Sequence, residues 1–298
     1  MTFDQIVLGW CVAVPALIAG AVGVLAALLA PRLGTGRWQP ALVAGLTGIG
    51  WWVAVVVGIV GRREGQWWPD EFWQFSLLGS LVAAVLLSGG VSQGTSSGTH
   101  CGDGFGGWTL VGLLAIATAW FALPAGEGWE DMLPLHRHWM GAVAVSGLLN
   151  AWAVERLARA DAQPWLLWSV VAGLAGPLVL AAATYGALAE AALAAVAATT
   201  AFALLTLVPK FRIGWVVAFP AVFCIAPLTA AARFYSYEDR PWWLYAVACT
   251  IPAIVSLVDL PLRRRPRWLR VGVAAVVAGL LVGICIWQGL GVSQEESW

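Results

Sequence analysis

The sequence predicts an all-α protein, a polytopic transmembrane helical bundle of about ten spans that forms one integral membrane domain over residues 1–298 without a soluble domain. Two observations predict this class. Hydrophobic residues make up 60% of the 298 positions and charged residues only 11%, whereas soluble domains are about 45–50% apolar and about 25% charged. The apolar residues also form runs of the length that crosses a bilayer, which is about 20 residues.

Ten runs reach this length. We expect them, in chain order, near 6–29, 40–60, 73–91, 108–124, 139–157, 165–185, 190–208, 213–232, 242–260 and 270–290. The first is expected to be a retained helix, because the residues before it lack the basic character of a secretory signal and the apolar run is long for a signal core.

Proline residues support this count. The first, seventh and ninth runs end at Pro31, Pro209 and Pro261, and basic residues follow each proline closely. Proline ends a helix, and basic side chains stay among the lipid headgroups. All three runs are odd-numbered and should leave the membrane on one face, so a missed span between them would break this parity.

The sixth and seventh runs need a turn between them, because Glu190 is the only charged residue from Trp165 to Val208. As one helix this stretch would be about 66 Å long, twice the thickness of a bilayer. We place the turn at Tyr185–Gly186 through Glu190, since glycine and charge belong at an interface. Both runs are dense in alanine, which predicts a tight helical hairpin.

The basic residues predict an orientation, because Lys and Arg in short loops favour the cytoplasmic side. Eleven of the sixteen fall on the face where odd-numbered runs end: Arg32, Arg37, Arg156, Arg159, Lys210, Arg212, Arg263, Arg264, Arg265, Arg267 and Arg270. Five fall on the other face: Arg62, Arg63, Arg137, Arg233 and Arg240. We therefore expect both termini on the non-cytoplasmic side.

Composition excludes several classes of function. Sixteen basic and sixteen acidic residues cancel, so no nucleic acid partner is expected. Five cysteines without a Cys-X-X-Cys pair indicate neither a disulfide framework nor a thiolate metal site. The twenty tryptophans suit the membrane interface, where the ring is partly buried and its N–H stays hydrated, and they point to the lipid bilayer as partner.

Three prolines mark a candidate substrate region of kinked helices. Pro220 and Pro227 fall inside the eighth run and Pro252 inside the ninth. A proline removes a helical hydrogen bond, and broken helices form substrate sites in transporters, where freed carbonyl groups face a cavity. The alternative is that proline is common in transmembrane helices without function.

The middle of the spans offers no charged group. Its polar residues are neutral, such as Asn150, for which we expect a helix–helix hydrogen bond rather than a ligand. The absence of a charged residue at mid-span counts against a proton pump or a carrier coupled to ions by buried carboxylates. It counts less against a carrier of neutral or apolar solutes.

Two polar loops hold metal-ligating residue types. The loop after the third run contains His100, Cys101 and Asp103, a set that could bind metal or supply a nucleophile, or could belong to a flexible connector. The loop after the fourth run contains four residues that could bind a divalent metal or form solvated interfacial charge: Glu130, Asp131, His136 and His138. We expect no cofactor, because the three histidines lie outside the spans and on opposite faces, where they cannot sandwich a haem.

No catalytic signature occurs in the chain, so an enzyme is not the favoured class. The first hypothesis is a carrier for a small neutral or lipid-like solute. The second is a non-catalytic subunit or scaffold of a larger membrane complex, with membrane-protein partners or a homo-oligomer. The third is an interfacial enzyme that uses the loop with His136 and His138.

Overall fold

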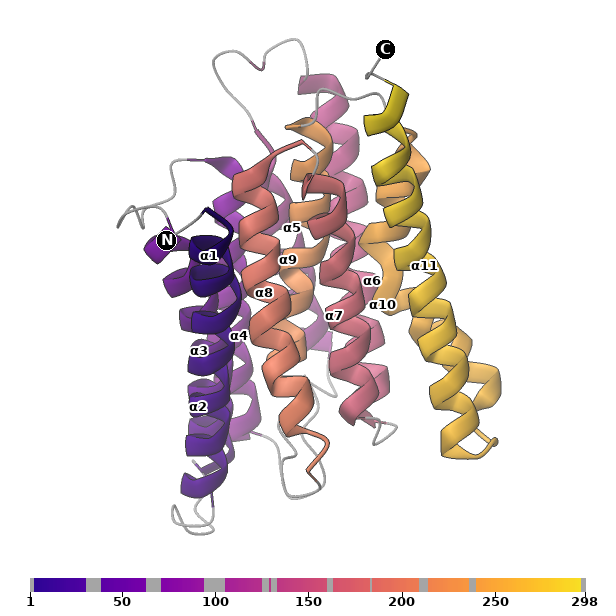
Figure 1. The fold of residues 1–298 in the computed structure, drawn as a ribbon. Coiled ribbons are helices and arrows are strands. Elements are labelled where there is room, and N and C mark those ends of the chain that lie inside the picture. The colour runs from indigo at the N-terminus through magenta and orange to yellow at the C-terminus, as the bar shows by residue number, and fades with distance from the viewer. Residues whose placement is uncertain are drawn as a thin grey trace.

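The computed structural model describes residues 3–30, 39–62, 71–93, 105–124, 129, 133–159, 163–182, 184–208, 214–235 and 240–295. Within these ranges ten helical segments stand side by side as one bundle (Figure 1). The first is continuous and comprises α1 (Phe3–Val7), the π-helical η1 (Leu8–Ala13) and α2 (Val14–Leu29). The others are α3 (Gln39–Arg62), η2 (Phe72–Gln74) with α4 (Phe75–Gln93), α5 (Phe105–Ala122), α6 (Leu133–Arg159), α7 (Gln163–Ala182), α8 (Gly186–Leu205), α9 (Gly214–Phe234), α10 (Trp242–Leu262) and α11 (Arg267–Glu295).

Each of the ten predicted runs coincides with one helical segment, which confirms the predicted helical bundle. Seven segments are long and apolar enough to cross a membrane, and the described residues add two shorter apolar helices, Phe72–Leu86 and Gly107–Ala122. The remaining helix, α6, is 27 residues long and carries charged residues toward both ends. The chain is therefore a multi-pass membrane protein.

The π-helical segment in the first span follows from Pro15. This residue has no N–H to donate to the carbonyl four residues earlier, so the regular hydrogen-bond pattern fails there. The Val14 N–H instead donates to the Gly9 carbonyl, five residues back. The helix continues through the proline as a local π-bulge.

The chain turns between the sixth and seventh spans at Tyr185, the first residue of the predicted turn, whereas Gly186 through Glu190 are already helical. Helix α7 ends at Ala182 and α8 begins at Gly186, and the Tyr185 N–H donates to the Ala181 carbonyl (2.8 Å). The two helices pack along each other as the predicted hairpin. Glu190 lies inside the first turns of α8, where it accepts a hydrogen bond from the guanidinium of Arg62 on α3 (3.0 Å).

The centre of the bundle is filled by α9. Of its most apolar stretch, 94% of the residues are buried inside the protein, and α9 contacts every helix from α3 to α8 as well as α10. The corresponding fraction is 22% for the first span and 11% for α11. The bundle thus has a solid core around α9 and two edge helices that face the surroundings.

Buried polar side chains join neighbouring helices. The Trp51 indole N–H on α3 donates to the Thr199 hydroxyl on α8 (2.9 Å), and the Asn150 amide on α6 donates to the Cys249 carbonyl on α10 (2.7 Å). The Asn150 contact confirms the predicted helix–helix hydrogen bond. Such bonds satisfy polar groups that would otherwise face an apolar interior.

Candidate functional site: an apolar groove between α7, α10 and α11

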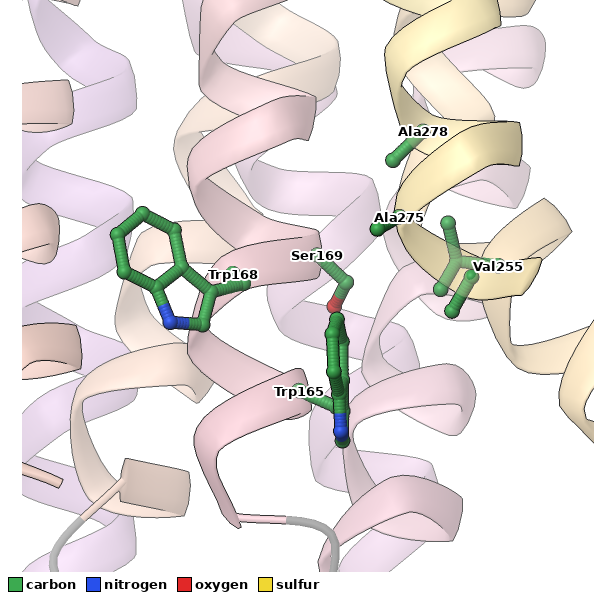
Figure 2. Close-up of a pocket in the computed structure, with 7 residues that line it drawn as sticks. Trp165, Trp168, Ser169, Val255, Ala275 and Ala278 are labelled. Atoms are coloured by element: carbon green, nitrogen blue, oxygen red, sulfur yellow. The ribbon is translucent and has the colours of Figure 1, made fainter. Parts of the chain in front are cut away.

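A groove of about 340 Å³ lies between α7, α10 and the edge helix α11 (Figure 2). Its walls come from all three helices: Trp165, Trp168 and Ser169 of α7, Val255 of α10, and Ala274, Ala275 and Ala278 of α11. The Ser169 hydroxyl donates to the Leu166 carbonyl of its own helix (2.7 Å). The groove is therefore an apolar site that fits a hydrocarbon chain rather than a polar molecule.

The sequence creates this groove by placing small side chains opposite large ones. The three alanines of α11 recur at helical spacing and lie on one side of that helix, while α7 contributes the indole ring of Trp165; the Trp168 ring extends to the other side of α7 (Figure 2). Trp165 projects toward α10 and α11 in Figure 2. Ser169, Val255 and Ala274 are buried, the two tryptophans are partly buried, and Ala275 is exposed. This gradient of burial shows that the groove opens on the side of the bundle.

Close contact between α7 and α10 closes the groove toward the middle of the bundle. A Cβ atom at Gly173 would lie 2.9 Å from the Pro252 ring, and one at Gly176 would lie 2.9 Å from the Ala248 Cβ. Pro252 cannot donate a hydrogen bond to the Ala248 carbonyl, and this carbonyl faces Gly176. The two glycines let the helices meet one and two turns beyond Ser169.

An ion pair closes the other end of the groove. The Arg270 guanidinium on α11 donates to both carboxylate oxygens of Asp259 on α10 (2.8 and 2.6 Å). Asp259 lies one turn beyond Val255, and Arg270 lies one turn before Ala274, so the pair continues the same helix faces that line the groove. We call this end of the bundle, with the α10–α11 turn at Arg263, Arg264 and Arg265, the basic end.

The predicted proline region is divided between the core and the groove. Pro220 and Pro227 lie within α9, which is a continuous helix buried in the core. Pro252 lies within α10, one turn from Val255 at the closed end of the groove. Of the three prolines, only Pro252 adjoins the candidate site, and a role of the three in substrate binding stays a prediction.

The metal-binding candidates are placed only in part. His100, Cys101, Asp103, Glu130 and Asp131 lie outside the described residues. Over the ranges that are described, no group of three or more His, Cys, Asp or Glu side chains comes together in a way that could hold a metal ion. The metal-site predictions therefore stay predictions.

The placement of His136 and His138 in a loop is wrong, because α6 begins at Leu133 and both residues lie in its first turns. The helix extends beyond the apolar stretch, as transmembrane helices can do at an interface. His136 is fully buried and His138 is exposed. Residues two apart on a helix point to different sides, so the two imidazoles diverge.

The end of the bundle opposite the basic end holds an aromatic cluster that the sequence did not predict. The Glu71 carboxylate accepts hydrogen bonds from the Trp73 indole and the Tyr185 hydroxyl (both 2.5 Å), and the Tyr185 ring stacks on Tyr235 (5.0 Å between centroids). These residues follow α3, α7 and α9 in sequence and meet only in the fold. The cluster joins the ends of helices and encloses no described cavity.

His136 belongs to the same end of the bundle. Its ring lies edge-to-face against Phe234 of α9 (4.2 Å between centroids) and 5.6 Å from Trp129. His136 precedes the apolar stretch 139–157, and burial lowers the pKa of its imidazole, while the nearby Pro124 carbonyl opposes this shift. A buried ring packed against aromatic side chains indicates a structural role.

Residues of the groove carry no functional motif that could have identified them. Trp165 and Trp168 suit the start of any transmembrane helix at an interface, and the alanines of α11 suit any apolar helix. The available signal was the spacing of Ala274 and Ala278, which places two small residues on one side of α11. This spacing indicates a groove only when the structure shows that α7 packs beside this face of α11.

Comparison of the chain with protein-family models, with curated proteins and with solved structures finds no match to any of the three.

Proposed function

We propose that this protein is a carrier for a lipid-like solute, which it takes from the bilayer into the groove between α7, α10 and α11. The observation that carries this proposal is a groove of about 340 Å³ with apolar walls, open on the side of a membrane bundle. A molecule that already lies in the membrane can enter such a site sideways. A water-soluble solute would have to cross the hydrocarbon to reach it.

The core supports a lipid-like solute over a small water-soluble one. A carrier for a polar solute places its site near the middle of the bundle, where helices separate. Here α9 occupies that position and 94% of its most apolar stretch is buried. The edge helix α11, unlike the central α9, packs mainly on two helices, α7 and α10. Movement of α11 away from them would open the groove.

The same proposal includes an orientation. The first described helix begins and α11 ends at the same end of the bundle (Figure 1), and the opposite end holds Arg263, Arg264 and Arg265 in one turn. By the preference of basic loops for the cytoplasm, the basic end faces the cytoplasm and the groove lies in the inner leaflet. Single cysteines in the α10–α11 turn, protected from an impermeant thiol reagent in intact cells, test this orientation.

Transbilayer lipid movement in proteoliposomes tests the carrier. The purified protein is reconstituted with a trace of phospholipid that bears a fluorophore on its headgroup, and an impermeant reductant is added outside. With a carrier the fluorescence falls below the level left by the inner leaflet of protein-free vesicles. Loss of only the outer-leaflet signal would refute lipid transport. Uptake of a labelled polar solute such as glycerol in the same vesicles would show that the carrier transports a water-soluble solute instead.

A second candidate function is a subunit of a larger membrane assembly. It is favoured by the outer face of α11, where Gly272, Gly279 and Gly283 recur within one narrow stripe and a Cβ at each would meet nothing within 4 Å. Glycines at this spacing let transmembrane helices approach closely. Purification in mild detergent distinguishes the two functions, because a subunit copurifies with partners in fixed ratio and a stand-alone carrier is isolated as a monomer or homo-oligomer.

A further inference from the structure

We infer that the occupant of the groove is a glycerophospholipid with a negatively charged headgroup, bound with its phosphate at Arg263, Arg264 and Arg265 and an acyl chain between α7 and α11. This inference rests on the proposed function and names the solute class of the same site. Three features support it: the apolar groove, the exposed arginines beyond its end and the distance between them.

The groove by itself cannot select a lipid. An acyl chain in a bilayer is already surrounded by hydrocarbon, so a wall of Trp and Ala side chains offers it little more than the membrane does. Selectivity must come from the part of the lipid that differs between lipids, which is the headgroup. The residues at the headgroup level next to the groove therefore decide which lipid binds.

Those residues are positively charged. Arg263, Arg264 and Arg265 are exposed, and none of them makes an ion pair with a residue that the structure describes. The Arg265 N–H donates to the Leu262 carbonyl (2.8 Å), which holds the three in a tight turn. Arg156 on α6 lies near enough to Arg263 for their charges to interact, and its guanidinium lies over the Trp152 ring (5.2 Å).

The acidic residue at the groove does not cancel this charge. Asp259 accepts hydrogen bonds from Nε and Nη2 of Arg270, so this pair is neutral as a unit. The basic residue Arg62 at the other end of the bundle is paired with Glu190 through one hydrogen bond. Positive charge thus remains on Arg263, Arg264 and Arg265, where the α10–α11 turn adjoins the groove. Arginine binds the phosphate of any phospholipid through paired hydrogen bonds, and a headgroup with a net negative charge binds better because it brings no cation of its own to oppose the arginines.

The spacing matches one phospholipid. Val255 in the groove, Asp259 in the ion pair and Arg263 in the turn follow each other at intervals of four residues on one face of α10. Each interval corresponds to about 6 Å along the helix, so the turn lies about 12 Å beyond the groove. A headgroup at the turn lies at the membrane surface, and an acyl chain that starts there reaches the groove.

Photo-crosslinking tests the inference. The full-length protein is reconstituted in phosphatidylcholine vesicles with a trace of either phosphatidylglycerol or phosphatidylcholine that carries a photoreactive acyl chain, and the labelled peptides are identified by mass spectrometry. We expect peptides with Trp165 and with Ala275 to be labelled, and labelling by phosphatidylglycerol to exceed that by phosphatidylcholine by about tenfold or more, since each basic residue near the membrane surface contributes about fivefold.

Two variants separate the headgroup from the acyl chain. R263Q/R264Q/R265Q should abolish the preference for phosphatidylglycerol, because labelling by this lipid should fall to about the level of phosphatidylcholine. A275F/A278F fills the groove and should remove labelling by both lipids. K210Q/R212Q, which removes charge from another loop predicted on the same side, should keep the preference, and V276F on the exposed face of α11 should keep both labels.

Equal labelling by the two lipids in the wild-type protein would overturn the inference, as would a preference that survives in R263Q/R264Q/R265Q. A monodisperse elution profile of each variant excludes unfolding as the cause of a lost label. Lipid movement without a headgroup preference would leave the proposed carrier standing and refute the inference. Selective labelling without lipid movement would refute the carrier and leave the inference standing.

Discussion

The ion pair between Asp259 and Arg270 should hold the edge helix α11 on the bundle. Only 11% of the most apolar stretch of α11 is buried, so its packing is weak and this bidentate contact is a large part of its attachment. Removing one member of a buried pair costs about 3–5 kcal/mol, because the other charge stays buried without a partner. The side chains here are 10% and 19% exposed, so we expect about 2–4 kcal/mol for D259N.

Cys285 provides the assay, because it lies on α11 and is fully buried. Alanine at the other four cysteines leaves it as the single thiol: Cys11, Cys101, Cys224 and Cys249. A thiol reagent then reacts only when α11 separates from the bundle, so the labelling rate reports the opening equilibrium. A cost of about 2–4 kcal/mol raises this rate by about 30- to 1,000-fold.

The double variant D259L/R270L distinguishes an ion pair from a general packing effect. It leaves no unpaired charge, and replacing both partners by apolar residues is often nearly neutral, so its labelling rate should return to within about tenfold of the wild-type value. E190Q, which breaks the ion pair between α3 and α8, should leave the rate unchanged. A double variant as reactive as D259N, or a D259N rate equal to wild type, would refute the reasoning.

Three further predictions concern the core and the opposite end. Gly176→Ala should lower the free energy of unfolding by about 1–3 kcal/mol in a detergent titration followed by circular dichroism, because its Cβ meets the backbone of α10 at 3.3 Å, whereas Gly279→Ala, which meets nothing within 4 Å, should not. Asn150→Ala should lower it by about 0.6 kcal/mol and at most about 1.7 kcal/mol in the same titration, the range measured for hydrogen bonds between membrane helices. Burial lowers the pKa of His136 in the folded protein, so the imidazole of the unfolded chain takes up a proton at higher pH, and the free energy of unfolding should fall as pH drops below about 6.5. Urea or detergent titrations across pH measure this dependence. It should be weaker in His136→Phe and unchanged in His138→Gln.

The spans could be predicted from the sequence because the bilayer imposes their length. Every helix needs about 20 apolar residues whatever its neighbours are, so even the long run from Trp165 to Val208 could be divided at the right turn. The boundaries were less accurate. Helix α6 begins at Leu133 rather than near 139. Its backbone hydrogen bonds continue past the point where the side chains become polar, so the hydrophobicity of the sequence cannot predict where the helix begins.

The groove could not be predicted, because it depends on which helices are neighbours. Trp165 and Ala275 are 110 positions apart, and their residue types are ordinary for transmembrane helices. Likewise, the charged residues around His136 in the sequence predict a polar loop, yet its side chain packs against Phe234 of α9. Spacing within one helix reveals a face, but only the arrangement of the helices shows what that face contacts.

The most direct test of the proposed lipid carrier is transbilayer lipid movement by a variant whose groove is filled by larger side chains. A275F/A278F and V276F are reconstituted at the same density as the wild-type protein, and the movement of the headgroup-labelled lipid is followed after adding the impermeant reductant. The two matched changes lie on the same helix, but only the first fills the groove, since Val276 is 61% exposed on the other side. The account predicts that A275F/A278F falls to the rate of protein-free vesicles while V276F keeps the wild-type rate. Wild-type lipid movement in A275F/A278F would contradict it.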